Sequence, residues 1–196
     1  MPNRPHRVLL ALAGGVLALS GCSAVDAGQA AVSEAFRISQ ATVDAQASEV
    51  AVGLGQPASE PPAGLAAGIT QRLVQNALLA VKAEELSYTP TPSELEQGMT
   101  ELTEAQGGHD QLVQAALQAG IPESALPDVV RTNLLVARLS GTAGDQGAAT
   151  VQQQISELSE ALNVEVAPRY GTWDDATLSI VTGSPVVDSG ETPATS

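Results

Sequence analysis

The sequence predicts a mostly helical domain that carries only a minimal sheet. Apolar residues make up 43% of the 196 residues, which is enough for a helical core, whereas aromatic residues make up only 2%. Sheet-rich folds draw heavily on aromatic and β-branched residues, so this balance argues against a large β-sandwich or barrel. Apolar residues also recur at helical spacing in several stretches separated by Gly and Pro. We therefore expect one domain of five or six helices, with two or three short strands pairing its N- and C-terminal segments.

The first elements of this domain are short. Residues 30–39 carry three spaced apolar residues and predict a small hairpin or an edge strand. Ser39 is suited to cap a helix over residues 40–52, because its hydroxyl can accept a hydrogen bond from the first turn. Residues 53–62 contain Gly, Ser and three prolines and predict a loop.

A long helix is expected from about residue 62 to residue 86. Its apolar residues recur every four positions: Leu65, Ile69, Leu73, Ala77 and Val81. Thr91 and Glu94 then have the spacing of a capping box, with Pro92 at the first helical position. These three residues predict that the next helix begins at residue 92, and we expect it to end near residue 105.

Two further helices are expected over residues 110–119 and 123–139, separated by the helix stop and restart of Gly120-Ile121-Pro122. Residues 141–147 predict a loop, and the apolar spacing over residues 151–162 predicts a last amphipathic helix.

The C-terminal region changes from helical to alternating spacing. Residues 164–167 and 177–180 alternate apolar and polar side chains, which predicts two short antiparallel strands. Residues 183–196 are rich in Ser, Thr, Pro and Gly, and we expect a disordered tail there.

The first 22 residues fall into three zones. Basic residues stand at positions 4, 6 and 7, and an uncharged run covers residues 8–19. That run is too short for a membrane-spanning helix, which needs roughly 20 apolar residues, and its length is typical of a signal peptide. The zone ends in Leu19, Ser20, Gly21 and Cys22. This tetrapeptide resembles the lipobox of bacterial lipoproteins, in which the cysteine is acylated and becomes the new N-terminus.

These zones predict a lipoprotein signal peptide over residues 1–21, lipidation of Cys22 and a tether over residues 22–28. The protein is then expected on the outer face of the cytoplasmic membrane, held by its lipid anchor. An ordinary secreted protein with a chance cysteine, or a short buried helix, are the alternatives. The formal net charge of −14 repels phosphate backbones, so we expect no nucleic-acid partner. The single cysteine excludes an internal disulfide and a cysteine-based zinc cluster.

Three motifs lie at the junctions of the expected elements. Gly107-Gly108 precedes a short helix, and Gly120-Ile121-Pro122 precedes a helix with an internal Arg131. Residues 163–174 spell Asn-Val-Glu-Val-Ala-Pro-Arg-Tyr-Gly-Thr-Trp-Asp. Together these motifs resemble the N-terminal chaperone domain of actinobacterial SurA-type lipoproteins, over about residues 29–182. The resemblance implies a structural role for Asn163, Pro168, Arg169, Tyr170, Gly171 and Trp173.

The chain also departs from that family. Glu34-Ala35 stands where relatives often have an Asn-Gly turn, which removes the residue that favours a tight hairpin. No gap between the expected helices is long enough for the parvulin isomerase domain that full SurA-type and PrsA-type foldases insert. His109 is the only histidine after the expected signal peptide, so the histidines of parvulin-type chemistry are missing. We therefore expect no isomerase activity.

Other chemistry has little support in the sequence. Six acidic residues cluster in the middle of the chain: Glu84, Glu85, Glu94, Glu96, Glu101 and Glu104. They lack the pattern of a calcium loop, and a solvated helix face is the better interpretation than a carboxylate pair or a cation site. His109 has no evident second ligand or triad partner. Tyr170 and Trp173 are either ligand-stacking residues or covers of the core edge, and we favour the second.

The resemblance implies a non-catalytic chaperone that binds unfolded or newly exported polypeptides, with no cofactor and no metal. The apolar stripe of the long helix either forms the wall of the client groove or belongs to the buried core. Its candidate groove residues are Leu65, Ile69, Leu73 and Val81. The alternatives in function are a structural or adaptor lipoprotein with one specific envelope partner, and a degenerate prolyl isomerase.

Overall fold

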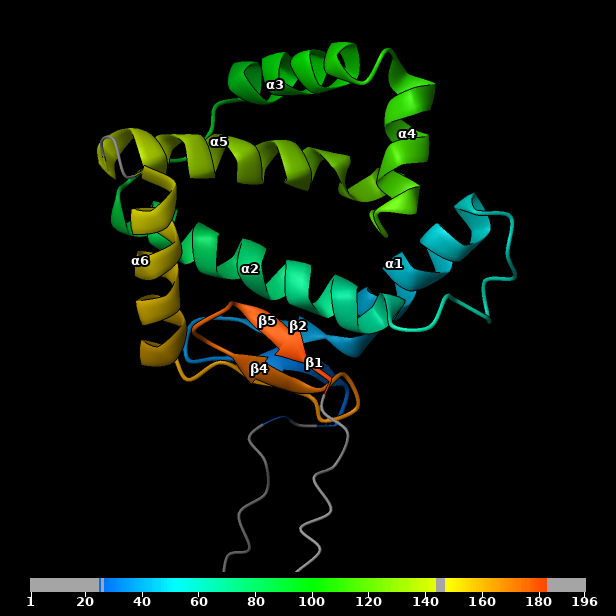
Figure 1. Cartoon of the computed structure of the whole chain (residues 1–196), viewed down its shortest axis with the longest axis horizontal. Coiled ribbons are helices and arrows are strands. Elements are labelled where there is room, and N and C mark those ends of the chain that lie inside the picture. The colour runs from blue at the N-terminus through cyan, green and yellow to red at the C-terminus, as the bar shows by residue number, and fades with distance from the viewer. Residues whose placement is uncertain (1–24, 26, 144–146, 183–196) are drawn as a thin grey trace, which may run out of the picture.

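The structure, a computed structural model, describes residues 25, 27–143 and 147–182. This part of the chain is mostly helical with a few short strands, which confirms the predicted fold class (Figure 1). Its helices are α1 (Gln40–Gly53), α2 (Leu65–Glu85), α3 (Pro92–Ala105), α4 (His109–Gln118), the short 3₁₀ helix η1 (Glu123–Ala125), α5 (Leu126–Ala143) and α6 (Gly147–Ala161). Its strands are β1 (Gln29–Val32), β2 (Arg37–Ser39), β3 (Glu165–Val166), β4 (Thr172–Asp174) and β5 (Ser179–Val181).

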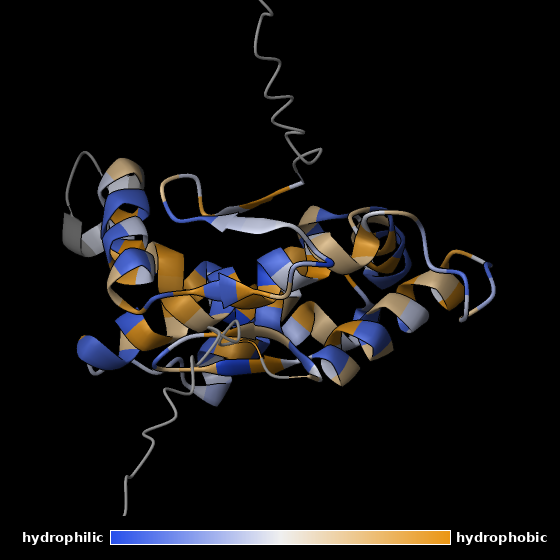
Figure 2. Cartoon of the chain, turned by 90° about the horizontal axis from the view of Figure 1, so that it is seen from below, coloured by the Kyte–Doolittle hydropathy of each residue, from blue (hydrophilic) through white to orange (hydrophobic). Residues whose placement is uncertain are grey.

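Helix α2 lies at the centre of the molecule. The short strands cover one side of it, α5 lies on the other side, and α3 lies beyond α5 (Figure 1). Helices α1 and α6 pack against α2 near its two ends, so that α2 has neighbours along most of its circumference. Each helix carries both hydrophobic and hydrophilic residues, as expected of helices that bury only one face (Figure 2).

Strand β1 is the central strand of a three-stranded sheet. It pairs antiparallel with β2 on one edge and antiparallel with β3 on the other. Of the two alternatives predicted for residues 30–39, a hairpin or an edge strand, the hairpin is therefore confirmed. Ala31 lies opposite Val166, so the sheet joins the two ends of the described chain, as predicted. A separate hairpin is formed by β4 and β5, in which Trp173 lies opposite Ile180.

The prediction that residues 164–167 pair with residues 177–180 is therefore wrong. Strand β3 pairs with β1, and the partner of β5 is β4, which lies in the segment expected to connect them. Alternation of apolar residues shows which side chains face the core, but it does not identify the partner strand. The turn between β4 and β5 is closed by the Asp174 carboxylate, which accepts hydrogen bonds from the N–H groups of Ala176 and Thr177 at 2.9 and 3.2 Å.

The loop predicted over residues 141–147 is wrong at residues 141–143 and 147, while residues 144–146 lie outside the described residues. Helix α5 continues through Gly141 to Ala143, and α6 begins at Gly147. A glycine inside a helix costs only about 1 kcal/mol, which the packing of α5 against α6 outweighs. At Gly147 a side chain is not tolerated, because a Cβ there would lie 2.8 Å from the backbone oxygen of Ser140. This close approach lets the first turn of α6 lie against the end of α5.

The buried residues form two separate clusters. The main core joins the sheet, α1, α2, α5 and α6, and a small second cluster joins α3 and α4 to the start of α5. The second cluster is centred on Leu112, Ala116 and Leu126. Side-chain hydrogen bonds connect α1 to α2, η1 to α1, and α5 to α2. They comprise Arg72 to Gln46, Ser124 to Glu49, and Thr132 to Asn76.

The motif at residues 163–174 places two aromatic side chains in the main core. Tyr170 and Trp173 are 6% and 8% exposed and lie in the main core, as expected of residues that cover it. The indole N–H of Trp173 donates to the Ser159 hydroxyl at 2.8 Å and to the Asp175 carboxylate at 3.0 Å. Gly171 has a φ of +123°, a conformation that residues with a side chain rarely adopt.

The remaining motif residues tie the C-terminal segment to the first strands. The Asn163 amide donates to the Glu34 carboxylate at 2.9 Å, next to the hairpin that connects β1 to β2. Arg169 donates to the backbone oxygen of Gln29 at 3.2 Å and lies over the ring of Tyr170. The Pro168 carbonyl accepts a hydrogen bond from the N–H of Gly171.

Candidate functional site

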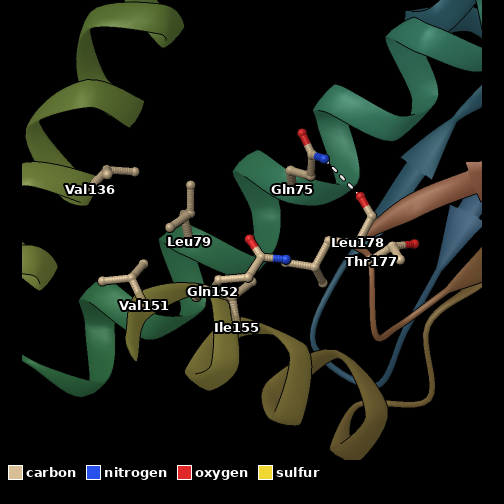
Figure 3. Close-up of a pocket in the computed structure, with 8 residues that line it drawn as sticks. All are labelled: Gln75, Leu79, Val136, Val151, Gln152, Ile155, Thr177 and Leu178. Carbon is tan, nitrogen blue, oxygen red and sulfur yellow. Dashed lines mark hydrogen bonds between the residues drawn. The ribbon is translucent and has the colours of Figure 1, made fainter. Parts of the chain in front are cut away.

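A largely apolar pocket, which we call the α6 pocket, lies between α2, α5, α6 and the turn of the β4–β5 hairpin. It encloses about 290 Å³. Figure 3 shows the eight residues that line it: Gln75, Leu79, Val136, Val151, Gln152, Ile155, Thr177 and Leu178. None of these described lining residues is ionisable.

Two glutamines and a threonine hold the walls of the α6 pocket in place, whereas the side chain of the lining residue Gln152 makes no hydrogen bond among the described residues. The amide of Gln75 donates to the backbone oxygen of Leu178 at 2.7 Å (Figure 3). One turn away on α2, the Gln71 side chain accepts the N–H of Ile180 at 2.9 Å. The Thr177 hydroxyl is hydrogen-bonded to the Ser179 hydroxyl at 2.7 Å. With these groups paired, the pocket offers a ligand mainly apolar contact.

Val136 marks the outer edge of the α6 pocket. Its side chain is 37% exposed, which is high for a large apolar residue, whereas Val151 and Ile155 on the facing helix are buried. Leu178 closes the opposite end with a φ of +51°, a strained backbone conformation for leucine. Isolated exposed apolar residues are common, but one at the mouth of an apolar pocket marks a surface that a hydrophobic partner can cover.

A second pocket, which we call the Arg72 groove, lies between the end of α1, the start of α2 and the chain that follows α4. It encloses about 490 Å³. Its lining residues are Val50, Leu54, Pro62, Ala63, Leu65, Gly68, Ile69, Arg72, Leu117, Gln118, Ala119, Gly120 and Ile121. Most are apolar, and Arg72 supplies the one charged group among them.

The guanidinium of Arg72 is only partly satisfied. Its Nη2 donates to the Gln46 side chain at 2.5 Å, while its Nη1 is buried and has no hydrogen-bond partner within the described residues. Burial lowers the pKa of Arg72 below its ordinary value, and the nearby Asp128 carboxylate opposes this change. The ordinary pKa of arginine is so high that the group stays charged at neutral pH.

The stripe expected to form a groove wall along the long helix is mainly core. Ile69 is 1% exposed, and Leu65 and Leu73 are half-buried against the main core. Val81 is half-buried and, like Leu73, lines neither pocket. Only Leu65 and Ile69, near the start of α2, border the Arg72 groove. The central position of α2 explains this outcome, because a helix with neighbours on most sides has no free apolar face.

The acidic residues singled out in the sequence are surface groups. Glu84, Glu85, Glu96, Glu101 and Glu104 are exposed, and Glu94 serves the capping box at the start of α3. The Glu94 carboxylate accepts the N–H of Thr91 at 2.7 Å. His109 is exposed and contacts the Glu123 carboxylate at 3.2 Å. Among the described residues, His, Cys, Asp and Glu form no group of three or more that could hold a metal ion.

Several predicted features lie outside the described residues: Leu19, Ser20, Gly21, Cys22, the signal peptide over residues 1–21 and the tail over residues 183–196. The expected tether at residues 22–28 is described only in part. Val25 within it packs against the main core, and the Gly28 carbonyl accepts the N–H of Gln40. Contacts with the folded domain therefore begin before residue 29, within the expected tether. In the described part of the chain, no helix combines the length and apolar character needed to cross a membrane.

No protein-family model, curated protein or solved structure matches this chain. Function is therefore inferred from the two pockets together with the sequence.

Proposed function

We propose that the protein is a lipid-anchored extracytoplasmic lipoprotein that binds unfolded or newly exported polypeptides without catalysing a reaction. The lipobox-like residues before Cys22 and the resemblance to SurA-type chaperone domains support this proposal from the sequence. The observation that carries it is the α6 pocket, whose lining is mostly apolar and in which Gln75 and Thr177 are hydrogen-bonded within the protein.

Such a pocket suits a client that offers apolar side chains in no fixed arrangement. Burying one large apolar side chain contributes about 1.5–3 kcal/mol, which gives weak binding that many sequences can share. The acidic surface supports the same function, because a net charge of −14 keeps a complex with an aggregation-prone chain in solution.

Aggregation assays test this proposal directly. Three unrelated, chemically unfolded proteins are diluted into buffer with the chain from Ser23 to Ser196, and light scattering is recorded. We expect suppression of all three near stoichiometric ratios. Suppression of none contradicts the chaperone proposal and favours an adaptor with one specific partner, to be sought by pull-down.

A matched pair of valine variants ties the activity to the pocket. Val136→Glu places a charge at the mouth of the α6 pocket, while Val52→Glu places the same charge on α1, where Val52 is 59% exposed and lines neither pocket. We expect Val136→Glu to lose suppression and Val52→Glu to keep it. Equal activity of the two variants would show that clients bind elsewhere.

A further inference from the structure

The Arg72 groove combines apolar walls with the guanidinium of Arg72, in which the Nη1 atom lacks a hydrogen-bond partner among the described residues. Unpaired buried N–H groups are rare in folded proteins, because each one loses its hydrogen bonds to water without replacement. Here the unpaired atom is Nη1 of Arg72, and the surrounding walls come from residues such as Val50, Ile69 and Leu117. Arg72 lines the groove, so a carboxylate bound there lies near the guanidinium and pairs with Nη1 once the side chain turns toward it.

Two carboxylates on the neighbouring helices hydrogen-bond to other groups. Asp128 on α5 forms an ion pair with Arg131. Glu49 on α1 accepts hydrogen bonds from both the N–H and the hydroxyl of Ser124, at 3.0 and 2.6 Å. Neither is hydrogen-bonded to Arg72, whose hydrogen-bond partner among the described residues is the neutral amide of Gln46. Asp128 therefore acts on Arg72 through its charge alone, and Nη1 has no hydrogen-bonded anion among the described residues.

We propose that the Arg72 groove binds the C-terminal end of a polypeptide, with the free α-carboxylate on Arg72 and an apolar last side chain against the groove walls. In a C-terminal residue the carboxylate and the side chain share one Cα, so an apolar wall beside a guanidinium meets both groups at once. The volume of about 490 Å³ lies within the range of small-ligand pockets. This inference rests on the proposed function and names one class of client segment.

Fluorescence anisotropy with two peptides tests the proposal. The probes are a labelled octapeptide that ends in Val-Leu with a free carboxylate, and the same peptide with a C-terminal amide. Each is titrated with the full chain held in lipid nanodiscs. We expect the free acid to bind about tenfold more tightly or better, because a charge-assisted hydrogen bond to arginine is lost in the amide. Equal affinities would overturn the proposal.

Variants then assign the preference to Arg72. Arg72→Met removes the charge while keeping an aliphatic stem, and we expect it to bind acid and amide equally. Lys82→Met, which removes one positive charge near the far end of α2, is the control and keeps the preference. Arg72→Lys retains a cation and should keep part of the preference, which covers the case in which Arg72→Met fails to fold. An Arg72→Met chain that folds and still prefers the acid contradicts the proposal.

A competition experiment separates a peptide from a lipid carboxylate. Dodecanoate that displaces the acid peptide and binds ten times more tightly than it would overturn the peptide assignment. Failure here is distinct from failure of the proposed function. Equal binding of acid and amide peptides leaves polypeptide binding in place, whereas absence of any aggregation suppression removes the chaperone proposal.

Discussion

Replacing Gly171 by alanine tests how the C-terminal motif holds the fold. Gly171 has a φ of +123°, and a Cβ there would lie 2.7 Å from both the backbone oxygen of Val181 and a methyl carbon of Ile180. The backbone conformation costs about 1–3 kcal/mol for a residue with a side chain. The overlap adds about 1–3 kcal/mol, because a backbone oxygen cannot rotate away. We expect Gly171→Ala to lower the free energy of unfolding by about 2–6 kcal/mol.

Urea unfolding followed by Trp173 fluorescence measures this loss. Trp173 is the single tryptophan, it is buried in the main core, and it lies two residues from the substitution. Gly141→Ala is the control, because no atom lies within 4 Å of a Cβ at that exposed position in α5. We expect the control to stabilise the chain by up to about 1 kcal/mol. A Gly171→Ala chain that unfolds at the same urea concentration as the parent would show that the backbone conformation and close contacts at Gly171 do not limit stability.

Three further predictions concern a helix crossing, a helix cap and the anchor. Gly98→Ala should destabilise by about 1–2 kcal/mol, because its Cβ would lie 2.6 Å from Val130; adding Val130→Ala should recover part of that loss in thermal unfolding, and additive losses would contradict it. Thr91→Ala should cost about 1 kcal/mol at neutral pH. Hydrogen bonds from Thr91 hold the pKa of Glu94 below its ordinary value. The stabilisation by this cap is therefore present at a pH above the ordinary pKa of glutamate, and it is lost as the pH falls through the pKa of Glu94 in the folded chain. A stability difference between the parent and Thr91→Ala that does not change with pH argues against this cap. Cys22→Ala should abolish acyl labelling and release the protein from the membrane, and continued retention would disprove the anchor.

Local signals in the sequence were sufficient to predict most helix boundaries. The capping box of Thr91 and Glu94 is present, and α3 begins at Pro92 as expected. The Ser39 hydroxyl caps α1 by accepting the N–H of Thr42 at 3.1 Å. These signals are reliable because donor and acceptor are only three residues apart, so no distant contact competes with them.

Strand pairing and the lengths of α5 and α6 depend on distant contacts. The predicted pairing was wrong, and so was the predicted loop at residues 141–143 and 147. The alternation at residues 164–167 fits β3 equally well whether its partner is β1 or β5. Gly141 is a helix breaker by propensity, yet packing of α5 against α6 keeps it helical. In each case tertiary contacts outweigh a preference that is worth about 1 kcal/mol.

The pockets were not predictable from helical spacing. The α6 pocket draws Leu79, Val136, Ile155 and Leu178 from four different elements, and each belongs to an ordinary apolar pattern in the sequence. Spacing identified the stripe on α2 but gave no means to tell a groove from a core. The sequence feature that could have indicated the second pocket is Arg72, a positively charged residue next to the apolar stripe of the long helix.

The proposed function requires an unfolded polypeptide to bind over the α6 pocket. Hydrogen exchange of the full chain, with and without a reduced and carboxymethylated protein that cannot fold, locates the bound surface directly. We expect slower exchange in α5 around Val136, in the first turns of α6 and in the β4–β5 turn, with α3 unchanged. Slower exchange confined to α3, or none at a saturating concentration of the unfolded protein, would contradict it.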